Sequence, residues 1–223
     1  MFGFVLSIDI KPEFVEQYRR LALETTGVDE EFEGGLRVFA EHRDQHTSNR
    51  FWYLEIFKDV EARDALRSLP TIERYLAERE PIMIERVVAS EFSIARTAGM
   101  NFSGDGWYNP VPDDSYGELI KVEVPPEASD AYEESMRRAF TQANIATRGI
   151  CVGEFVDRSN PDGNTRVIYV LSDSTKNFIN SYQRGPINRA LVHLQLDQGI
   201  TTDRISNFRL GRGAGIPMTI GIA

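Results

Sequence analysis

An internal repeat constrains the fold of this chain more than any other feature of its sequence. Four segments recur in the same order, at offsets that grow slowly from 114 to 116 residues: 10–13 and 124–127, 34–38 and 148–152, Asn49 and Asn164, and Pro70–Arg74 and Pro186–Arg189. Repeats of this kind indicate that one supersecondary unit is used twice. The slow drift is expected where small insertions fall in loops. The 223 residues are therefore predicted to form two similar units.

The two halves are predicted to contain the same elements in the same order. Alternating apolar residues predict strands, and proline at the first position predicts the start of a helix. In the first half these are a strand at 4–10, a helix from Pro12 to Thr26, strands at 36–43 and 49–57, helices at 61–68 and 72–79, and a strand at 87–94. In the second half they are a strand at 117–124, a helix at 127–143, strands at 149–157 and 165–172, helices at 174–183 and 187–196, and a strand at 203–210. The order β-α-β-β-α-β predicts an α+β fold made of two ferredoxin-like units.

The repeat also predicts a domain organisation. We expect a first unit at 1–98, a linker at 99–115 and a diverged second unit at 116–223. The linker contains Trp107 and Tyr108, so it is expected to dock on the body. The apolar tail at 216–222 is expected either to pack along one unit or to join two copies of the chain in a homodimer.

Charge and composition exclude several classes of function. The formal charge of −9 argues against nucleic acid or an anionic membrane as the main partner. No apolar run approaches the ~18 residues of a membrane span, and no basic segment follows Met1 as in a secretory signal. A cytoplasmic protein is therefore expected. One cysteine and three histidines make a metal-dependent enzyme a poor interpretation.

Alternation within the strands predicts how the sheets are covered. In the first strand, Phe4, Leu6, Ile8 and Ile10 share a face that should meet the helices. In the strand at 49–57 both faces are rich in large apolar side chains. We expect Trp52 to face the helices and Tyr53 and Glu55 to face a second sheet. The sheets of the two halves would then pack into one eight-stranded barrel, with Glu55 paired to Arg37 between them.

The motifs resemble those of the antibiotic biosynthesis monooxygenase family, within the dimeric α+β barrel superfamily. The resemblance is carried by Ile-Lys-Pro-Glu at 10–13, Gly-Gly-Leu at 34–36, and Asn-Arg-Phe-Trp-Tyr-Leu-Glu-Ile-Phe-Lys-Asp at 49–59. It covers nearly all of residues 2–94, while the second half matches in outline only. The whole chain thus resembles a fused pseudo-dimer.

This resemblance implies an oxygenase of polycyclic aromatic polyketides such as anthrones, quinols or angucyclines. The implied chemistry is hydroxylation, quinone formation or oxidative ring opening with O2 as co-substrate. Such enzymes work either without a tightly bound cofactor or with diffusible reduced flavin (FADH2 or FMNH2) from a separate reductase. An ionised substrate supplies electrons to O2 itself, so the protein needs an aromatic pocket, a proton acceptor and donors that hold the enolate.

The sequence offers two candidates for the proton acceptor. His42 ends the second strand, and its pKa lies near working pH. Glu154 interrupts an apolar face that we expect to meet the helices, which indicates a polar pocket there. The structural alternatives are a solvated strand-end histidine and a strand whose faces are assigned one residue off.

Four further residues are candidates for binding the substrate: Trp52, Tyr169, Tyr182 and His193. Trp52 could wall a planar ring, and Tyr169 and Tyr182 could line the same cavity as Glu154. His193 lies on the last helix and is a candidate base or ligand. For each of them an ordinary core or surface position is the alternative.

Two other functions stay open on the sequence alone. A haem-degrading enzyme of the same superfamily would need a strand-end tryptophan, but Phe57 and Ser172 stand there. A non-catalytic barrel that binds or organises other biosynthetic proteins is the alternative from a different class. Polar residues on the pocket side, here His42 and Glu154, favour catalysis over scaffolding.

Overall fold

The eight strands close into one antiparallel barrel in the order β1-β3-β2-β8-β5-β7-β6-β4. The structure is a computed structural model that describes residues 2–25, 36–44, 46–99, 115–146, 150–158, 160 and 162–214. The strands are β1 (Phe2–Ile10), β2 (Leu36–Asp44), β3 (Arg50–Phe57), β4 (Met83–Ala98), β5 (Tyr116–Glu123), β6 (Ile150–Asp157), β7 (Thr165–Ser172) and β8 (Thr201–Ala214). We call β1–β4 with their helices the first half, and β5–β8 with theirs the second half.

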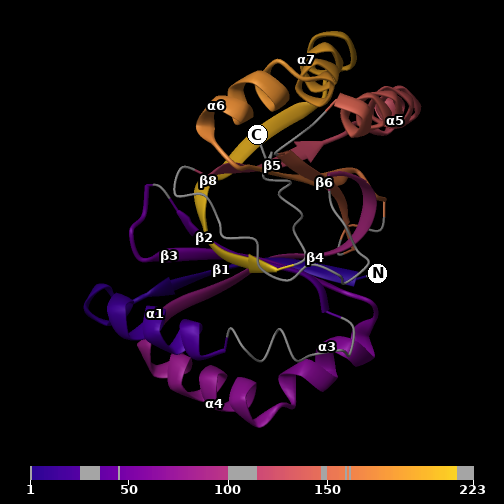
Figure 1. Cartoon of the computed structure of the whole chain (residues 1–223). Coiled ribbons are helices and arrows are strands. Elements are labelled where there is room, and N and C mark those ends of the chain that lie inside the picture. The colour runs from indigo at the N-terminus through magenta and orange to yellow at the C-terminus, as the bar shows by residue number, and fades with distance from the viewer. Residues whose placement is uncertain are drawn as a thin grey trace.

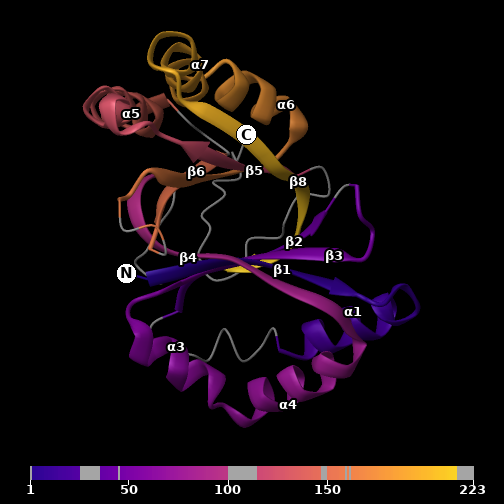
Figure 2. The ribbon, with the colours of Figure 1, turned by 180° about the vertical axis from the view of Figure 1, so that it is seen from behind.

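The helices of the two halves lie on opposite outer sides of the barrel, as Figures 1 and 2 show from front and back. The first half has η1 (Pro12–Phe14), α1 (Val15–Glu24), α3 (Val60–Arg67), α4 (Pro70–Arg79) and η2 (Glu80–Ile82). The second half has η3 (Pro126–Ala128), α5 (Ser129–Ala146), α6 (Thr175–Asn177), the π-helix η4 (Phe178–Gln183) and α7 (Pro186–Gln198). The predicted α+β fold of two ferredoxin-like units that share a barrel is confirmed.

Local sequence explains where these helices begin. Proline stands at the start of η1, α4, η3 and α7, where its missing N–H costs nothing. Asp59 caps α3 by accepting the Ala62 N–H at 2.9 Å, and Ser174 caps α6 by accepting the Asn177 N–H at 3.2 Å. Such caps satisfy amide groups that the first turn leaves without partners. The same start signals therefore recur in both halves.

The closing strands differ from the prediction in length. β4 and β8 were expected at 87–94 and 203–210 but span 83–98 and 201–214. Each pairs with the first strand of its own half and then continues to an edge strand of the other half, as β4–β6 and β8–β2. These added residues are held by long-range pairing, which local alternation does not reveal.

The core has three layers. One cluster lies between the first sheet and α1, α3 and α4, and a second lies between the other sheet and α5, η4 and α7. The third fills the barrel interior with residues from both halves. There the rings of Phe92 and Phe155 stack with centroids 4.1 Å apart. We call the two outer clusters the helix-facing layers.

The predicted faces of β3 are wrong. Trp52 lies in the barrel interior with Leu54, whereas Tyr53 lies in the helix-facing layer. Alternation therefore puts Glu55 on the helix side as well. Tyr53 is paired with Leu6 of β1, and residues directly opposite each other share a face. Both faces of β3 are apolar, so only this register could decide between them.

Some predictions fall outside the described residues. These are the docking of Trp107 and Tyr108, the position of the tail at 216–222, and the side chain of Arg37. The domain boundaries at 98 and 115 also stay predictions. None of the helices in the described ranges has the length and apolarity that a membrane crossing requires.

Candidate functional site

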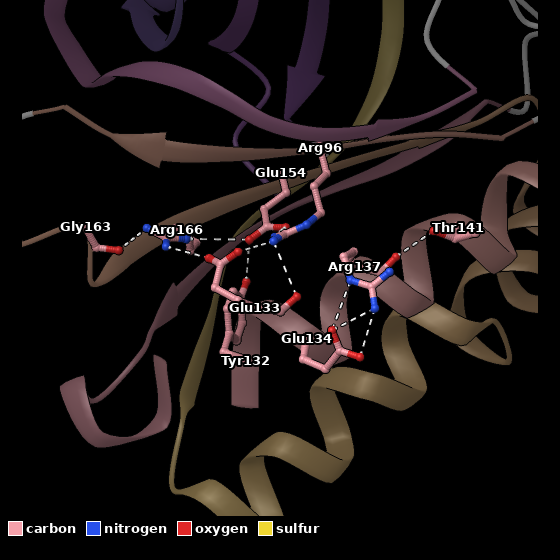
Figure 3. Close-up of polar contacts among 9 residues, drawn as sticks. All are labelled: Arg96, Tyr132, Glu133, Glu134, Arg137, Thr141, Glu154, Gly163 and Arg166. Atoms are coloured by element: carbon pink, nitrogen blue, oxygen red, sulfur yellow. Dashed lines mark hydrogen bonds and ion pairs between the residues drawn. The ribbon is translucent and has the colours of Figure 1, made fainter. Parts of the chain in front are cut away.

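Glu154 lies in the helix-facing layer of the second half, as predicted, in polar surroundings. Its side chain on β6 is fully buried and accepts hydrogen bonds on both oxygens (Figure 3). The Tyr132 hydroxyl on α5 donates to Oε1 at 2.9 Å, and Arg96 donates to Oε2 at 2.6 Å. Arg166 adds a charge contact, its Nε being 3.6 Å from Oε1. This carboxylate is therefore surrounded by donors.

Glu133 completes the cluster on the solvent side. Its side chain is 45% exposed and accepts hydrogen bonds from both Arg96 and Arg166, the latter at 3.1 Å. Two guanidinium groups thus meet two carboxylates, so the charges balance, as a buried ionic cluster requires. Because Arg96 lies on β4 and Glu154 on β6, the cluster fastens the seam between the halves.

The electrostatics of this cluster follow from burial. Burial raises the pKa of Glu154, more than Arg96 and Tyr132 lower it. Burial and the neighbouring Glu154 charge raise the pKa of Tyr132 well above its usual value. Desolvation opposes ionisation of Glu133, but hydrogen bonds from the two arginines prevail and lower its pKa. Both arginines thus have anionic partners.

The first half has a carboxylate at the equivalent place. Glu41 is paired with Tyr53, which is paired with Leu6; in the second half Glu154, Ile168 and Ile120 are paired in the same way. Glu41 is 5% exposed and accepts hydrogen bonds from Tyr53 at 2.9 Å and Tyr18 at 3.2 Å.

A second buried carboxylate distinguishes the second half. Glu118 on β5 is 2% exposed, and Arg204 of β8 lies 3.1 Å from its Oε1. The Tyr116 hydroxyl donates to the same oxygen at 3.4 Å. Burial raises the pKa of Glu118, more than Arg204 and Tyr116 lower it. The first half has Phe4 at this position, packed beneath the guanidinium groups of Arg63 and Arg67.

Tyr182 belongs to this second site. Tyr182 is 3% exposed on η4, and the centroid of its ring lies 5.3 Å from that of Phe178. The Phe178 ring in turn packs against Tyr116, with centroids 4.5 Å apart. The sequence predicted that Tyr182 lines a cavity with Glu154 and Tyr169. That grouping is wrong, because Tyr169 lies in the barrel interior. The register pairs Tyr169 with Gly153, whereas Glu154 points to the opposite face.

The other predicted site residues are dispersed. Trp52 lies in the barrel interior and donates its indole N–H to Asp44 at 3.2 Å. The backbone of His42 is paired with Trp52 and Leu210, and its side chain lies outside the described part of the chain. The structure therefore does not bring His42, Glu154 and Trp52 together in one described pocket.

His193 is exposed on α7 and lines a shallow pocket of about 120 Å³. The lining residues are Ala131, Ser135, His193, Leu194, Asp197 and Gln198. Small-molecule sites are typically about 300–1,000 Å³, so this hollow is too small for a polycyclic substrate.

Within the described ranges, no group of three or more His, Cys, Asp or Glu side chains is arranged to hold a metal ion. The expected use of reduced flavin stays a prediction.

Sequence reasoning missed Glu41, Glu118 and Arg96. The signal that revealed Glu154 was available for Glu118, because that carboxylate alternates with Tyr116 and Ile120 on a face where β1 has only apolar residues. Arg96 becomes visible only once β4 is known to reach β6.

Comparisons with known proteins show what this fold is similar to. No protein family and no curated protein match the sequence. Among solved structures, a candidate monooxygenase from Lactobacillus acidophilus NCFM matches with TM-score 0.75 and 13% identity, over 96% of this chain and 95% of that one. A candidate monooxygenase from Fusobacterium nucleatum subsp. nucleatum matches with TM-score 0.79 and 13% identity, over 96% and 94%.

An anthrone oxidase-like protein matches with TM-score 0.51 and 12% identity, over 100% of this chain and 97% of that one. At such identities the likeness shows a shared fold. The resemblance to monooxygenases expected from the sequence is thereby confirmed at the level of the fold.

Proposed function

We propose that this chain is an oxygenase of a polycyclic aromatic polyketide that carries an ionisable phenol or enol, and that the second half holds the reacting pocket. The observation that carries the proposal is the burial of two carboxyl groups, Glu118 and Glu154, in the helix-facing layer of that half. Burial raises the pKa of both groups, which makes them better proton acceptors than exposed carboxylates. Tyrosines and arginines surround them.

The proposed chemistry begins with removal of a substrate proton. The resulting enolate or phenolate is electron-rich enough to reduce O2. For an anthrone, the ring CH2 group and O2 give a ring carbonyl and one water, so the substrate supplies all the electrons. Where reduced flavin supplies two electrons instead, O2 delivers one oxygen atom to the substrate as a hydroxyl group or an inserted ring oxygen. The second atom leaves as water.

Two lines of support favour this reaction class. The whole-chain neighbours include proteins named as candidate monooxygenases and an anthrone oxidase-like protein. In addition, the donors around the buried carboxylates, namely Arg96, Arg166 and Arg204, are cations that stabilise an oxyanion.

Glu154 is the acceptor predicted from the sequence, but its geometry gives it a second role. Its side chain is fully buried behind its hydrogen-bond donors, so a substrate reaches it only if Arg96 or Tyr132 moves away. Its enclosed position fits the fastening of β4 to β6. His42 stays a candidate from the sequence.

Oxygen consumption tests the proposal. The purified chain is mixed with an anthrone, a quinol or an angucycline in air, with and without NADH and a flavin reductase. We expect O2 uptake above the uncatalysed rate with at least one substrate. Uptake only with the reductase would select the flavin route. Absence of uptake with all three would favour a scaffold protein, and a Soret band after addition of hemin would favour haem chemistry.

A further inference from the structure

The Glu118 carboxylate is buried but only partly satisfied. Its hydrogen bond with Tyr116 and its ion pair with Arg204 both fall on Oε1. Within the part of the chain that the structure describes, Oε2 makes no hydrogen bond. A carboxylate accepts several hydrogen bonds, so an oxygen of this kind is able to take another donor.

Two neighbouring polar atoms are also buried without partners. Among the described residues the Tyr182 hydroxyl has no hydrogen-bond partner, although Tyr182 is 3% exposed and close enough to Glu118 for the two groups to interact electrostatically. The Asn207 Oδ1 is likewise buried without a partner, on the β8 residue that is paired with Glu118. Buried polar atoms without hydrogen bonds are rare and costly, because each has lost its water. Two of them beside one carboxylate indicate a place where a polar ligand group binds.

The backbone over this place is itself unusual. Twelve positions separate the cap Ser174 from Pro186, whereas eleven separate the corresponding Asp59 and Pro70. The second half accommodates the additional residue as the π-helix η4, which carries Phe178 and Tyr182 inward. Insertions of this kind occur frequently at functional sites.

Gly185 permits the tight end of this π-helix. Its N–H donates to the Tyr182 carbonyl at 2.8 Å, and a Cβ at this position would overlap the carbonyl oxygen of Ser181. Leu69 stands at the equivalent position of the first half. The second half thus has a π-helix and a carboxylate where the first half has an ordinary helix and Phe4.

We propose that Glu118, Tyr182 and Asn207 bind the hydroxyl-bearing edge of a planar phenolic ring, with Glu118 accepting the phenol proton. The ring of the ligand packs against the aromatic side chains of Tyr116 and Phe178. Glu118 Oε2 takes the proton, and the O–H bond of the phenol breaks. The phenolate then receives a hydrogen bond from the Tyr182 hydroxyl and faces the Arg204 cation. Asn207 Oδ1 accepts from a second hydroxyl of the ligand.

This inference rests on the proposed function only for the class of the substrate. Its test measures binding and not turnover. The probe is 2-hydroxyanthraquinone, a planar phenol whose visible band moves to longer wavelength on ionisation. It is titrated with the full chain at a pH below its own pKa. We expect saturable binding with the band of the ionised form.

Three variants give the test its specificity. Glu118→Gln removes the acceptor and is expected to abolish the band shift and weaken binding at least about tenfold. Tyr182→Phe removes only an oxygen that has no hydrogen-bond partner in the described ranges. It is expected to weaken binding about three- to tenfold while the protein stays folded. The matched control is Glu123→Gln on the same strand, whose side chain is 42% exposed and which is expected to leave both binding and band shift unchanged.

The binding site and the proposed function are overturned by different results. Unchanged binding by Tyr182→Phe, or an unchanged band shift in Glu118→Gln, would overturn the site, because a merely structural role predicts both. Absence of probe binding by a chain that still oxidises an anthrone would overturn the site and leave the proposed function standing. Binding as expected without any O2 uptake would support the site and overturn the proposed function.

Discussion

The two halves of the barrel bury a carboxylate at the same place, each with a tyrosine donor from the first long helix of its half, but they differ at a neighbouring position. In the first half Glu41 is held by the hydroxyls of Tyr18 and Tyr53, with Tyr75 and the buried Arg79 beyond them. In the second half Glu154 accepts from the equivalent tyrosine, Tyr132, and contacts Arg96 and Arg166.

Across the seams between the halves, the register pairs an arginine with each carboxylate, Arg96 with Glu154 and Arg212 with Glu41. The clearer difference lies on the first strand of each half. The first half adds Phe4 where the second adds Glu118. Among the described residues, the second half therefore buries one more carboxylate than the first, and variants test whether that carboxylate serves function or stability.

The largest expected effect is on turnover. Glu118→Gln is expected to lower kcat for an anthrone by about 10²–10⁴-fold, because it removes a positioned proton acceptor. Glu41→Gln, which changes the buried carboxyl of the first half, is expected to retain most activity. Initial rates of O2 consumption measure both. Near-normal turnover in Glu118→Gln would mean that the two halves do not differ in catalysis as proposed.

The next largest effect is on the stability of the seam between β4 and β6. Arg96→Met leaves Glu154 buried with a weakened set of donors and is expected to lower the free energy of unfolding by about 3–5 kcal/mol. The double variant Arg96→Met/Glu154→Leu replaces both partners by apolar groups and is expected to recover a large part of that loss. Urea denaturation measures each. If the losses in the free energy of unfolding simply add, the two side chains are not coupled.

A smaller effect distinguishes two tyrosines. Tyr53→Phe removes a hydrogen bond to Glu41 and is expected to destabilise the protein by about 1 kcal/mol. Tyr182→Phe removes a buried hydroxyl that has no partner and is expected to stabilise the ligand-free protein by up to about 1 kcal/mol. Thermal unfolding compares them. A loss of stability in Tyr182→Phe would show that its hydroxyl has a structural partner.

The smallest effect is a pH dependence. The folded-state pKa of Glu118 is raised by burial, so the folded state favours the protonated carboxyl. Its contribution to stability is fully present below the unfolded-chain pKa of about 4.3 and is lost as pH rises through the folded-state pKa. Glu118→Gln is therefore expected to gain stability relative to the unmodified chain as pH rises from about 4 to neutrality. Parallel stability curves for the two proteins would contradict this.

Sequence patterns predicted the elements well because the repeat gave each one twice. The strand ahead of Pro12 and the strand ahead of Pro126 support each other, and Asn49 with Asn164 marks both turns. What could not be predicted depends on register. Trp52 and Tyr53 are both compatible with either face, and only pairing with β1 assigns them.

The candidate site was predictable only in part, for the same reason. Glu154 was found because a charge interrupts an apolar face, and the structure gives it polar partners there. Arg96 reaches Glu154 from a strand 58 residues away in sequence, so no local pattern pointed to it. Tyr182 was placed in the right layer but with the wrong carboxylate, because the π-helix shifts its position by one residue.

The long closing strands have a consequence for how this chain could be divided. Each strand of the barrel has a hydrogen-bonded neighbour on both sides, so the sheet has no open edge. A cut between β4 and β5 would leave each separated half with two bare edges, at β2 and β4 in one and at β6 and β8 in the other. Such edges are templates for pairing with other chains. The separated halves are thus expected to recombine with each other or to aggregate, and covalent linkage protects the chain from that outcome.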